Sequence, residues 1–113
     1  MSNLRDIPPQ IQQRLGVPLP RLTQFCQDNQ ISQLSVFGSI LRDDFTNESD
    51  IDLLVKFELG AKISIFKLIQ LENELQELLQ RNVDLVPQKA IENSQNWIRR
   101  SNILDDAEVI YVQ

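Results

Sequence analysis

Histidine is absent from this sequence of 113 residues, and cysteine, tyrosine and tryptophan occur once each. Without histidine the chain has neither the commonest general base nor the commonest zinc ligand, so carboxylates become the main candidates for acid-base or metal chemistry. The single cysteine, Cys26, cannot form an internal disulfide, and we expect it in the core because it lies among apolar positions of a predicted helix. Any catalytic chemistry must therefore be sought mainly among Asp and Glu.

The chain also lacks a long apolar run and a basic stripe. No stretch approaches the roughly 20 apolar residues of a membrane-spanning helix. The amino terminus is too polar for a secretory signal, so we expect a cytoplasmic protein without membrane contact. The formal net charge is −5, and charged residues of both signs occur throughout the chain. Direct binding to nucleic acid, which needs a basic groove, is not expected.

The composition, 42% hydrophobic and 24% charged, is typical of one globular domain with a single core. Prolines and a glycine punctuate residues 1–17, which we expect to form a loosely specified N-terminal leader before a domain at 18–113. Hydrophobic periodicity predicts the following elements: helices or helical turns at 20–29, 39–43 and 64–80, a helical region that follows Pro87 and runs through 97–98, and strands at 34–37, 51–57, 83–86 and 109–112. Because strands and helices alternate, we expect a small α/β (α+β) domain with a mixed sheet of about four strands and packed helices.

Two carboxylates lie two residues apart at the start of a predicted strand, in Asp50-Ile51-Asp52. Side chains two residues apart in a strand point to the same face about 6.6 Å apart, so Asp50 and Asp52 are expected side by side while Ile51 faces the core. Their repulsion is about 2.5 kcal/mol at an effective dielectric of 20, and a cation between them would offset it. Oxygen ligands without histidine or thiolate favour Mg²⁺ or Mn²⁺ over zinc.

Asp84 repeats this pattern in the predicted strand Val83-Asp84-Leu85-Val86. Its neighbours Val83 and Leu85 must face a core, so its carboxylate points to the other side of the sheet. If the two strands are adjacent, the three carboxylates can hold two metal ions, which stabilise the attacking and leaving oxygens in phosphoryl transfer. Asp84 is then also the candidate for assisting removal of the proton from an acceptor hydroxyl.

Gly38 and Ser39 supply a candidate anion site at a strand-to-helix junction. Glycine lets the backbone approach an anion closely, and serine opens a helix whose free N–H groups point at phosphate. Arg42 follows one helical turn later, where it either reaches the same phosphates or pairs with Asp43, Asp44 or Glu48. Gly38, Ser39 and Arg42 are therefore the candidate nucleotide-binding residues.

Gly38-Ser39, separated by ten residues from Asp50-Ile51-Asp52, resembles the signature of the DNA polymerase beta-like nucleotidyltransferase superfamily. The segment Ser49-Asp50-Ile51-Asp52-Leu53-Leu54-Val55 resembles its minimal nucleotidyltransferase branch. The resemblance extends through Val83–Val86, the strand that bears the third carboxylate in such proteins, to the closing residues 106–111, but not to the leader before Pro18. It implies the nucleotidyltransferase fold, ATP as substrate, and Asp50, Asp52 and Asp84 as catalytic and metal-binding residues for Mg²⁺.

Many members of this family are antitoxins of two-gene modules whose partner is a HEPN-domain ribonuclease. The resemblance implies that this chain binds such a toxin as a hetero-oligomer and transfers AMP from ATP to one of its tyrosine hydroxyls. Two alternatives stay open. A small-molecule nucleotidyltransferase would need an acceptor-binding region for which 113 residues leave little room. A non-catalytic antitoxin would act by contact alone, although the three carboxylates are intact.

Overall fold

The computed structural model describes residues 9–113, apart from the side chains of Trp97 and Arg99. Helices and strands follow one another in this order: α1 (Pro9–Leu15), α2 (Leu19–Asp28), β1 (Ile31–Phe37), the short 3₁₀ helix η1 (Gly38–Leu41), β2 (Ile51–Phe57), α3 (Ile65–Leu79), β3 (Val83–Pro87), α4 (Gln88–Glu92), α5 (Trp97–Asp106) and β4 (Glu108–Val112). The four strands form one sheet in the order β3-β2-β1-β4.

The sheet is mixed, as expected. Strand β1 is antiparallel to both of its neighbours, β2 and β4, whereas β2 and β3 run parallel. A parallel pair needs a crossover connection, and α3 provides it between β2 and β3. This connection places β2 and β3 side by side and brings the starts of both strands to the same edge of the sheet, so residues far apart in sequence meet there.

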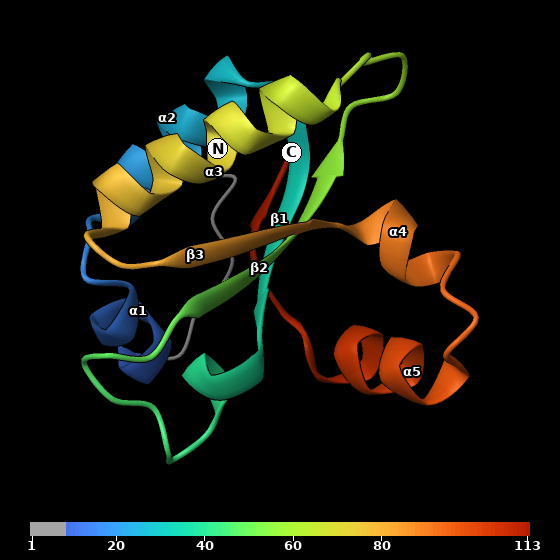
Figure 1. Cartoon of the computed structure of the whole chain (residues 1–113). Coiled ribbons are helices and arrows are strands. Elements are labelled where there is room, and N and C mark those ends of the chain that lie inside the picture. Colours follow the sequence, from blue (N-terminus) through green and yellow to red (C-terminus); the bar gives the residue numbers. More distant parts are fainter. Residues whose placement is uncertain (1–8) are drawn as a thin grey trace.

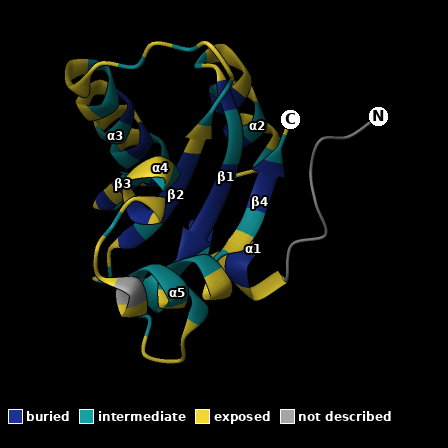
Figure 2. Cartoon of the chain, turned by 90° about the vertical axis from the view of Figure 1, so that its right-hand side faces the viewer, coloured by how far each residue is buried: buried dark blue, intermediate teal, exposed yellow. Residues whose placement is uncertain are grey.

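Helices cover both faces of the sheet (Figure 1). Helices α2 and α3 lie on one face, where the main core includes Cys26, Leu71 and Leu75. Helices α4 and α5 lie on the other face over a smaller cluster built on Phe37, Leu54 and Ile91. Figure 2 shows the buried band that runs along β1 and β2 between these layers. The expected α+β domain with a four-stranded mixed sheet is confirmed.

Strand β2 divides its side chains between the two faces. Ile51, Leu53 and Val55 are buried in the main core, and Leu54 belongs to the smaller cluster on the opposite face. Because side chains alternate along a strand, Asp52 lies on the same face as Leu54, under α4 and α5 rather than under α2 and α3. The face of the sheet that carries Asp52 is therefore the face with the smaller hydrophobic cluster.

Helix α3 shows how local sequence sets its ends. The Ser64 hydroxyl accepts a hydrogen bond from the backbone N–H of Lys67 at 3.1 Å, which caps the first turn. Leu71, Leu75 and Leu79 are buried at a spacing of four residues, and the helix stops at Gln80, which is left-handed with φ 55°. The predicted helix at 64–80 is therefore correct to within one residue at each end, counting the cap.

Part of the expected leader is built into the core. Residues 1–8 lie outside the described part of the chain, but α1 begins at Pro9, and its Ile11 and Leu15 are buried in the main core. The expectation of a loosely specified segment does not hold for 9–15, because apolar residues four apart on this short helix form a stripe that packs inward. The domain boundary at residue 18 stays a prediction.

Three other elements differ from the sequence prediction. Strand β1 begins at Ile31 rather than at residue 34, because Ile31 pairs with Phe57 across the sheet. The helical turn after β1 ends at Leu41, not at Asp43. The helical region predicted after Pro87 consists of two separate helices, the short α4 and then α5, which extends to Asp106.

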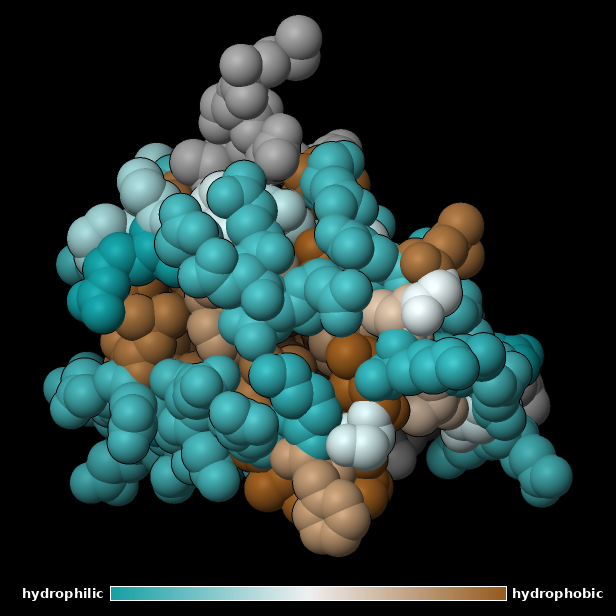
Figure 3. Space-filling model, turned by 90° about the horizontal axis from the view of Figure 1, so that it is seen from above, coloured by the Kyte–Doolittle hydropathy of each residue, from teal (hydrophilic) through white to brown (hydrophobic). Residues whose placement is uncertain are grey.

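Much of the surface seen from above is hydrophilic, with apolar groups between the polar ones (Figure 3). The exposed large apolar side chains include Leu59, Ile65, Phe66 and Ile69, around the loop between β2 and α3 and the start of that helix. None of the helices in the described residues combines the length and the apolar character that crossing a bilayer requires.

Candidate active site

The parallel pairing of β2 and β3 sets Asp52 directly opposite Asp84. On its other side, Asp52 pairs with Phe37, the last residue of β1. Neighbouring strands lie about 4.8 Å apart, so two carboxylates that are 32 positions apart in the chain become neighbours on one face of the sheet. The sequence analysis required the strands of Asp52 and Asp84 to be adjacent, and in this fold they are.

The other two predicted carboxylates, Asp50 and Asp84, both affect Asp52 electrostatically. Burial raises the pKa of Asp52 above its ordinary value, and the negative charges of Asp84 and Asp50 raise it further, while Arg42 lowers it. Asp52 is half-buried, whereas Asp50 and Asp84 are exposed. Asp50 lies just before β2 rather than within it, so its side chain belongs to the loop that enters the strand.

The carboxylates suit a divalent cation by their chemistry. Three acidic side chains gathered without a histidine or thiolate form a hard oxygen donor set of the kind that Mg²⁺ prefers. Burial, and then the negative charges of Asp84 and Asp50, raise the pKa of Asp52, and a cation bound beside it would act in the opposite direction. Within the described part of the chain, however, no three acidic, cysteine or histidine side chains already stand around a common metal position. Metal binding by these residues therefore stays a prediction.

Gly38 lies directly against Asp52. Its backbone has a φ of 77°, in the left-handed region that favours glycine. A Cβ atom at this position would collide with Oδ2 of Asp52 and would stand 3.2 Å from its Cγ. The sequence suggested that Gly38 permits close approach of an anion, and in the structure the anion nearest to it is the carboxylate of Asp52. Gly38 is therefore the point where the predicted nucleotide-binding turn contacts the predicted metal-binding carboxylates.

Ser39 lies within η1 and does not cap it. The N-cap residue is Phe37, and no side chain accepts a hydrogen bond there. The Ser39 hydroxyl instead donates a long hydrogen bond of 3.4 Å to the backbone carbonyl of Asp50. The expected contact with phosphate is untested, but Ser39 is placed beside the segment that carries Asp50.

Arg42 follows η1 in an extended conformation. Its Nε donates to Oδ1 of Asp44 at 3.4 Å, and 62% of the Arg42 side chain and 70% of the Asp44 side chain are exposed. An exposed ion pair of this length contributes little to stability, so the guanidinium can exchange this partner for another anion. Of the two sequence alternatives, the structure contains the pairing with Asp44, and Arg42 also acts on Asp52.

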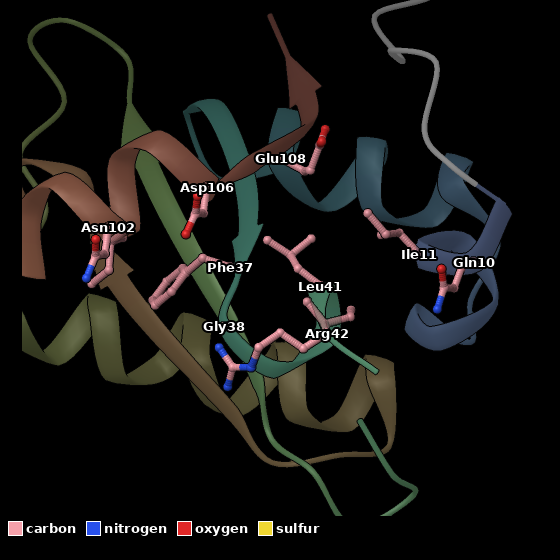
Figure 4. A pocket seen from close by; sticks show the side chains of 11 residues that line it. Gln10, Ile11, Phe37, Gly38, Leu41, Arg42, Asn102, Asp106 and Glu108 are labelled. Carbon is pink, nitrogen blue, oxygen red and sulfur yellow. The ribbon is translucent and has the colours of Figure 1, made fainter. Parts of the chain in front are cut away.

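A cavity of about 540 Å³ opens beside Gly38 and Arg42. Its walls come from five elements, α1, β1, η1, α5 and β4, and Figure 4 shows Asn102 and Asp106 of α5 facing Gln10 and Ile11 of α1 across it. No local sequence pattern indicates this cavity, because its lining residues are scattered from position 10 to position 108.

Sequence reasoning also missed Arg14 and Arg81. Both donate hydrogen bonds to backbone carbonyls of residues 40–49, the segment that joins the Gly38-Ser39 turn to Asp50. Contacts of a side chain with distant backbone carbonyls leave no recurring pattern in a sequence. Only the preference of arginine for several simultaneous hydrogen bonds hinted at such a role.

Comparison with known proteins agrees with this geometry. Residues 20–110 match the family model described as nucleotidyltransferase domain. A protein of Methanocaldococcus jannaschii described as a candidate protein adenylyltransferase is 41% identical over 82 residues, which cover 73% of this chain and 76% of that protein.

Two solved structures share the fold. A crystal structure of a toxin-antitoxin with AMP-PNP has a TM-score of 0.66 at 18% identity and covers 86% of this chain and 75% of that chain. A structure of the tri-AMPylated HEPN toxin of Shewanella oneidensis in complex with MNT antitoxin has a TM-score of 0.60 at 17% identity, with coverage of 91% and 73%. The fold, the motif spacing and the family match agree, and the chain belongs to the nucleotidyltransferase domain family.

Proposed function

We propose that this nucleotidyltransferase is a Mg²⁺-dependent protein adenylyltransferase that transfers AMP from ATP to a tyrosine hydroxyl of a HEPN ribonuclease toxin, and so acts as its antitoxin. The observation that carries the proposal is that Asp84 pairs with Asp52 across β2 and β3, while the charge of Asp50 acts on Asp52 and Gly38 lies directly against it. The description of the Methanocaldococcus jannaschii relative as a candidate protein adenylyltransferase supports the same reaction. We also propose that the protein acts in the cytoplasm, where ATP is available.

The reaction exchanges one phosphorus–oxygen bond for another. The acceptor oxygen forms a bond to the α-phosphorus of ATP, the bond from that phosphorus to the bridging oxygen breaks, and pyrophosphate leaves with the bond electrons. Asp50, Asp52 and Asp84 would hold two Mg²⁺ ions, which when bound neutralise charge on the attacking and leaving oxygens. The carboxylate of Asp84, which is exposed whereas that of Asp52 is half-buried, accepts the hydroxyl proton or passes it to water.

The residues on the other side of Asp52 would bind the triphosphate. Ser39 offers a hydroxyl, and η1 offers backbone N–H groups at the end of β1. Arg42 exchanges its exposed contact with Asp44 for the phosphates. The cavity of about 540 Å³ beside Gly38 and Arg42 gives the rest of the nucleotide room next to these groups.

The acceptor is proposed to be a protein because this domain is small. Its residues leave little room for a dedicated acceptor-binding region, and a partner protein can bring its own hydroxyl in line with the α-phosphate. The net charge of −5 favours docking on a basic, RNA-binding face. The solved complex that contains a tri-AMPylated HEPN toxin supports this class of partner.

Intact mass spectrometry of the partner tests this function directly. A HEPN-type ribonuclease, sought first in the reading frame next to this one, is purified, mixed with the chain, ATP and Mg²⁺, and weighed. We expect a mass gain of one or more AMP units that maps to tyrosine. Full neutralisation of the ribonuclease without a change in mass would instead support the non-catalytic antitoxin, and AMP transfer to a small molecule alone would support the small-molecule enzyme.

A further inference from the structure

A single loop, residues 42–50, connects the two halves of the candidate site. It starts at Arg42, directly after η1, and ends at Asp50, directly before β2. Most of its residues are exposed, and it contains four acidic side chains besides Arg42: Asp43, Asp44, Glu48 and Asp50. Such a loop, with like charges along it, needs external contacts if both of its ends are to keep one position.

Arg81 fixes the end of the loop that carries Asp50. Its Nη1 donates to the backbone carbonyl of Thr46 at 2.9 Å and to that of Ser49 at 2.8 Å. Ser49 is the residue immediately before Asp50. The next residue after Arg81, Asn82, accepts a hydrogen bond from the backbone N–H of Ile51 at 3.0 Å, so Asp50 is bracketed by two contacts from the turn before β3.

Arg14 fixes the other end. This residue of α1 lies 28 positions before Arg42, and its Nη1 donates to the backbone carbonyl of Arg42 at 2.7 Å and to that of Ile40 at 2.8 Å. The helix that supplies Arg14 is anchored by Ile11 and Leu15, which are buried in the main core. The contact therefore ties the nucleotide-binding end of the loop to the domain core through the N-terminal helix.

Phe45, in the middle of the loop, links these two arginines. The guanidinium carbon of Arg14 lies over its ring at 5.1 Å from the centroid, and that of Arg81 lies over the same ring at 4.6 Å. Both distances are within the range of a cation–π interaction. Phe45 also packs against the main core. One aromatic side chain and two cations thus hold the loop at its start, middle and end.

We propose that Arg14 and Arg81 are positioning residues for nucleotide transfer, which hold the loop through its backbone carbonyls and the Phe45 ring so that Arg42 and Asp50 face the same site. The inference rests on the proposed function of that site. A planar guanidinium suits this task because it binds two carbonyls and stacks on a ring at once, which an ammonium group cannot do in the same geometry.

The two arginines are expected to affect different kinetic constants. Arg81 holds the residues next to Asp50, a residue proposed to help hold Mg²⁺ for the transfer step, so its loss lowers kcat. Arg14 holds Arg42, which is proposed to bind the triphosphate, so its loss raises the KM for ATP. A residue that only stabilises the fold would lower the active fraction and leave both constants of the folded enzyme unchanged.

The experiment compares the wild type with Arg14→Met, Arg81→Met, Arg81→Lys and a control, Arg21→Met, an exposed arginine on α2. Amide hydrogen exchange by NMR reports on the loop without any catalysis. The useful amides are those of Thr46, Glu48 and Ser49, which bond to acceptors within the loop at 2.9 to 3.2 Å. Transfer kinetics with the partner, corrected for the folded fraction, give kcat and KM.

We expect the loop amides to exchange at least about 10-fold faster in Arg14→Met and Arg81→Met, while amides of α3 keep their rates. We expect kcat to fall about 10-fold or more in Arg81→Met, KM to rise several-fold in Arg14→Met, and Arg81→Lys to recover part of the loss. Arg21→Met should match the wild type. If Arg81→Met does not fold, Phe45→Leu, which keeps all four carbonyl contacts, should show a smaller change of the same kind.

Unchanged loop exchange in the folded variants, or unchanged kcat and KM despite faster exchange, would overturn the proposal. A wild type that transfers no AMP would refute the proposed function instead. In that case the exchange rates still decide whether the arginines hold the loop. The dissociation constant of ATP, measured with Mg²⁺, then replaces KM as the test of whether holding the loop improves nucleotide binding.

Discussion

Asp52 and Asp84 face each other across the parallel strands β2 and β3, on the side of the sheet that α4 and α5 cover. Like charges directly opposite each other on neighbouring strands destabilise a sheet by up to about 1 kcal/mol. Asp50 adds a third negative charge, and Arg42 compensates for only part of the total. A charge arrangement that costs stability in the free protein is typical of a site whose ligand supplies the missing cation.

The first prediction concerns pH and the free energy of unfolding. Folding raises the pKa of Asp52, so the folded chain holds this proton more tightly than the unfolded chain. The corresponding stability is present below the ordinary aspartate pKa and is lost as pH rises through the raised value. Asp52→Asn removes this loss, and we expect it to be more stable than the wild type at neutral pH by up to about 1 kcal/mol.

Urea unfolding at a series of pH values, with a chelator present, measures this difference. Asp28→Asn is the matched control, because Asp28 is exposed on α2 and accepts a hydrogen bond from Gln24 that asparagine can also accept. The control should follow the wild-type profile. If Asp52→Asn were less stable than the wild type across the whole range, the negative charge of Asp52 would be stabilising and the interpretation of the site would be wrong.

Divalent cations should reverse the cost of these charges. We expect Mg²⁺ or Mn²⁺ to raise the melting temperature of the wild type and to have little effect on Asp52→Asn, since a ligand that binds only the folded state adds about 2.7 kcal/mol at 100 times its Kd. ATP and Mg²⁺ should bind together far better than either alone. Differential scanning calorimetry measures the melting temperature, and isothermal titration calorimetry measures binding. ATP binding that is equally tight with excess chelator would exclude the metal site.

Gly38 and Gly60 offer a paired test of steric fit. Both have positive φ, 77° and 84°, so alanine is strained at either position. A new Cβ at Gly60 would meet nothing within 4 Å, whereas at Gly38 it would collide with the Asp52 carboxylate. We expect Gly60→Ala to cost about 1 kcal/mol and keep activity, and Gly38→Ala to cost more and lose transfer. Equal losses, measured by urea unfolding and transfer rate, would show that Asp52 can move away freely.

Ser39→Ala should weaken nucleotide binding without harming the fold. Ser39 does not cap η1, and the hydrogen bond that its hydroxyl donates to the carbonyl of Asp50 is long at 3.4 Å. Loss of one neutral hydrogen bond to phosphate corresponds to about 1 kcal/mol, or roughly a fivefold rise in the apparent constant for ATP. A variant with wild-type affinity but a lower melting temperature would instead assign Ser39 a structural role in holding Asp50.

How far the sequence predicted this structure depends on the kind of contact. Strand β2 was predicted at its true bounds, because its alternation and apolar face are visible within seven residues. The adjacency of Asp52 and Asp84 depends on which strands pair, which local pattern does not encode. It follows only once α3 is recognised as the crossover of a parallel pair.

Other parts of the site had no local signal at all. The contacts of Arg14 and Arg81 end on backbone carbonyls, which every residue has, so no residue pattern announces them. Helix α1 was expected as part of a loose leader, because prolines surround it and only Ile11 and Leu15 mark its buried face. The reason for a glycine at position 38 also required three dimensions, since its neighbour is Asp52 of another strand.

The last prediction separates contact with the partner from chemistry. Asp84 is exposed, and its carboxylate is proposed to assist in removing the acceptor proton, so Asp84→Asn should transfer little or no AMP. The substitution replaces one carboxylate oxygen with an amide nitrogen and removes a like charge opposite Asp52, so the fold should lose no stability. The partner should still bind. Intact mass of the partner, melting temperature and calorimetric partner affinity measure the three quantities.

Asp28→Asn again serves as the control, since it makes the same chemical change on α2, away from the carboxylates, and should transfer AMP like the wild type. The comparison distinguishes two mechanisms of toxin neutralisation. If Asp84→Asn binds the partner but leaves the ribonuclease active, neutralisation depends on transfer, and Asp84 takes part in it. If Asp84→Asn neutralises the ribonuclease as fully as the wild type, contact alone is sufficient, and the three carboxylates must serve some purpose other than inactivation of this partner.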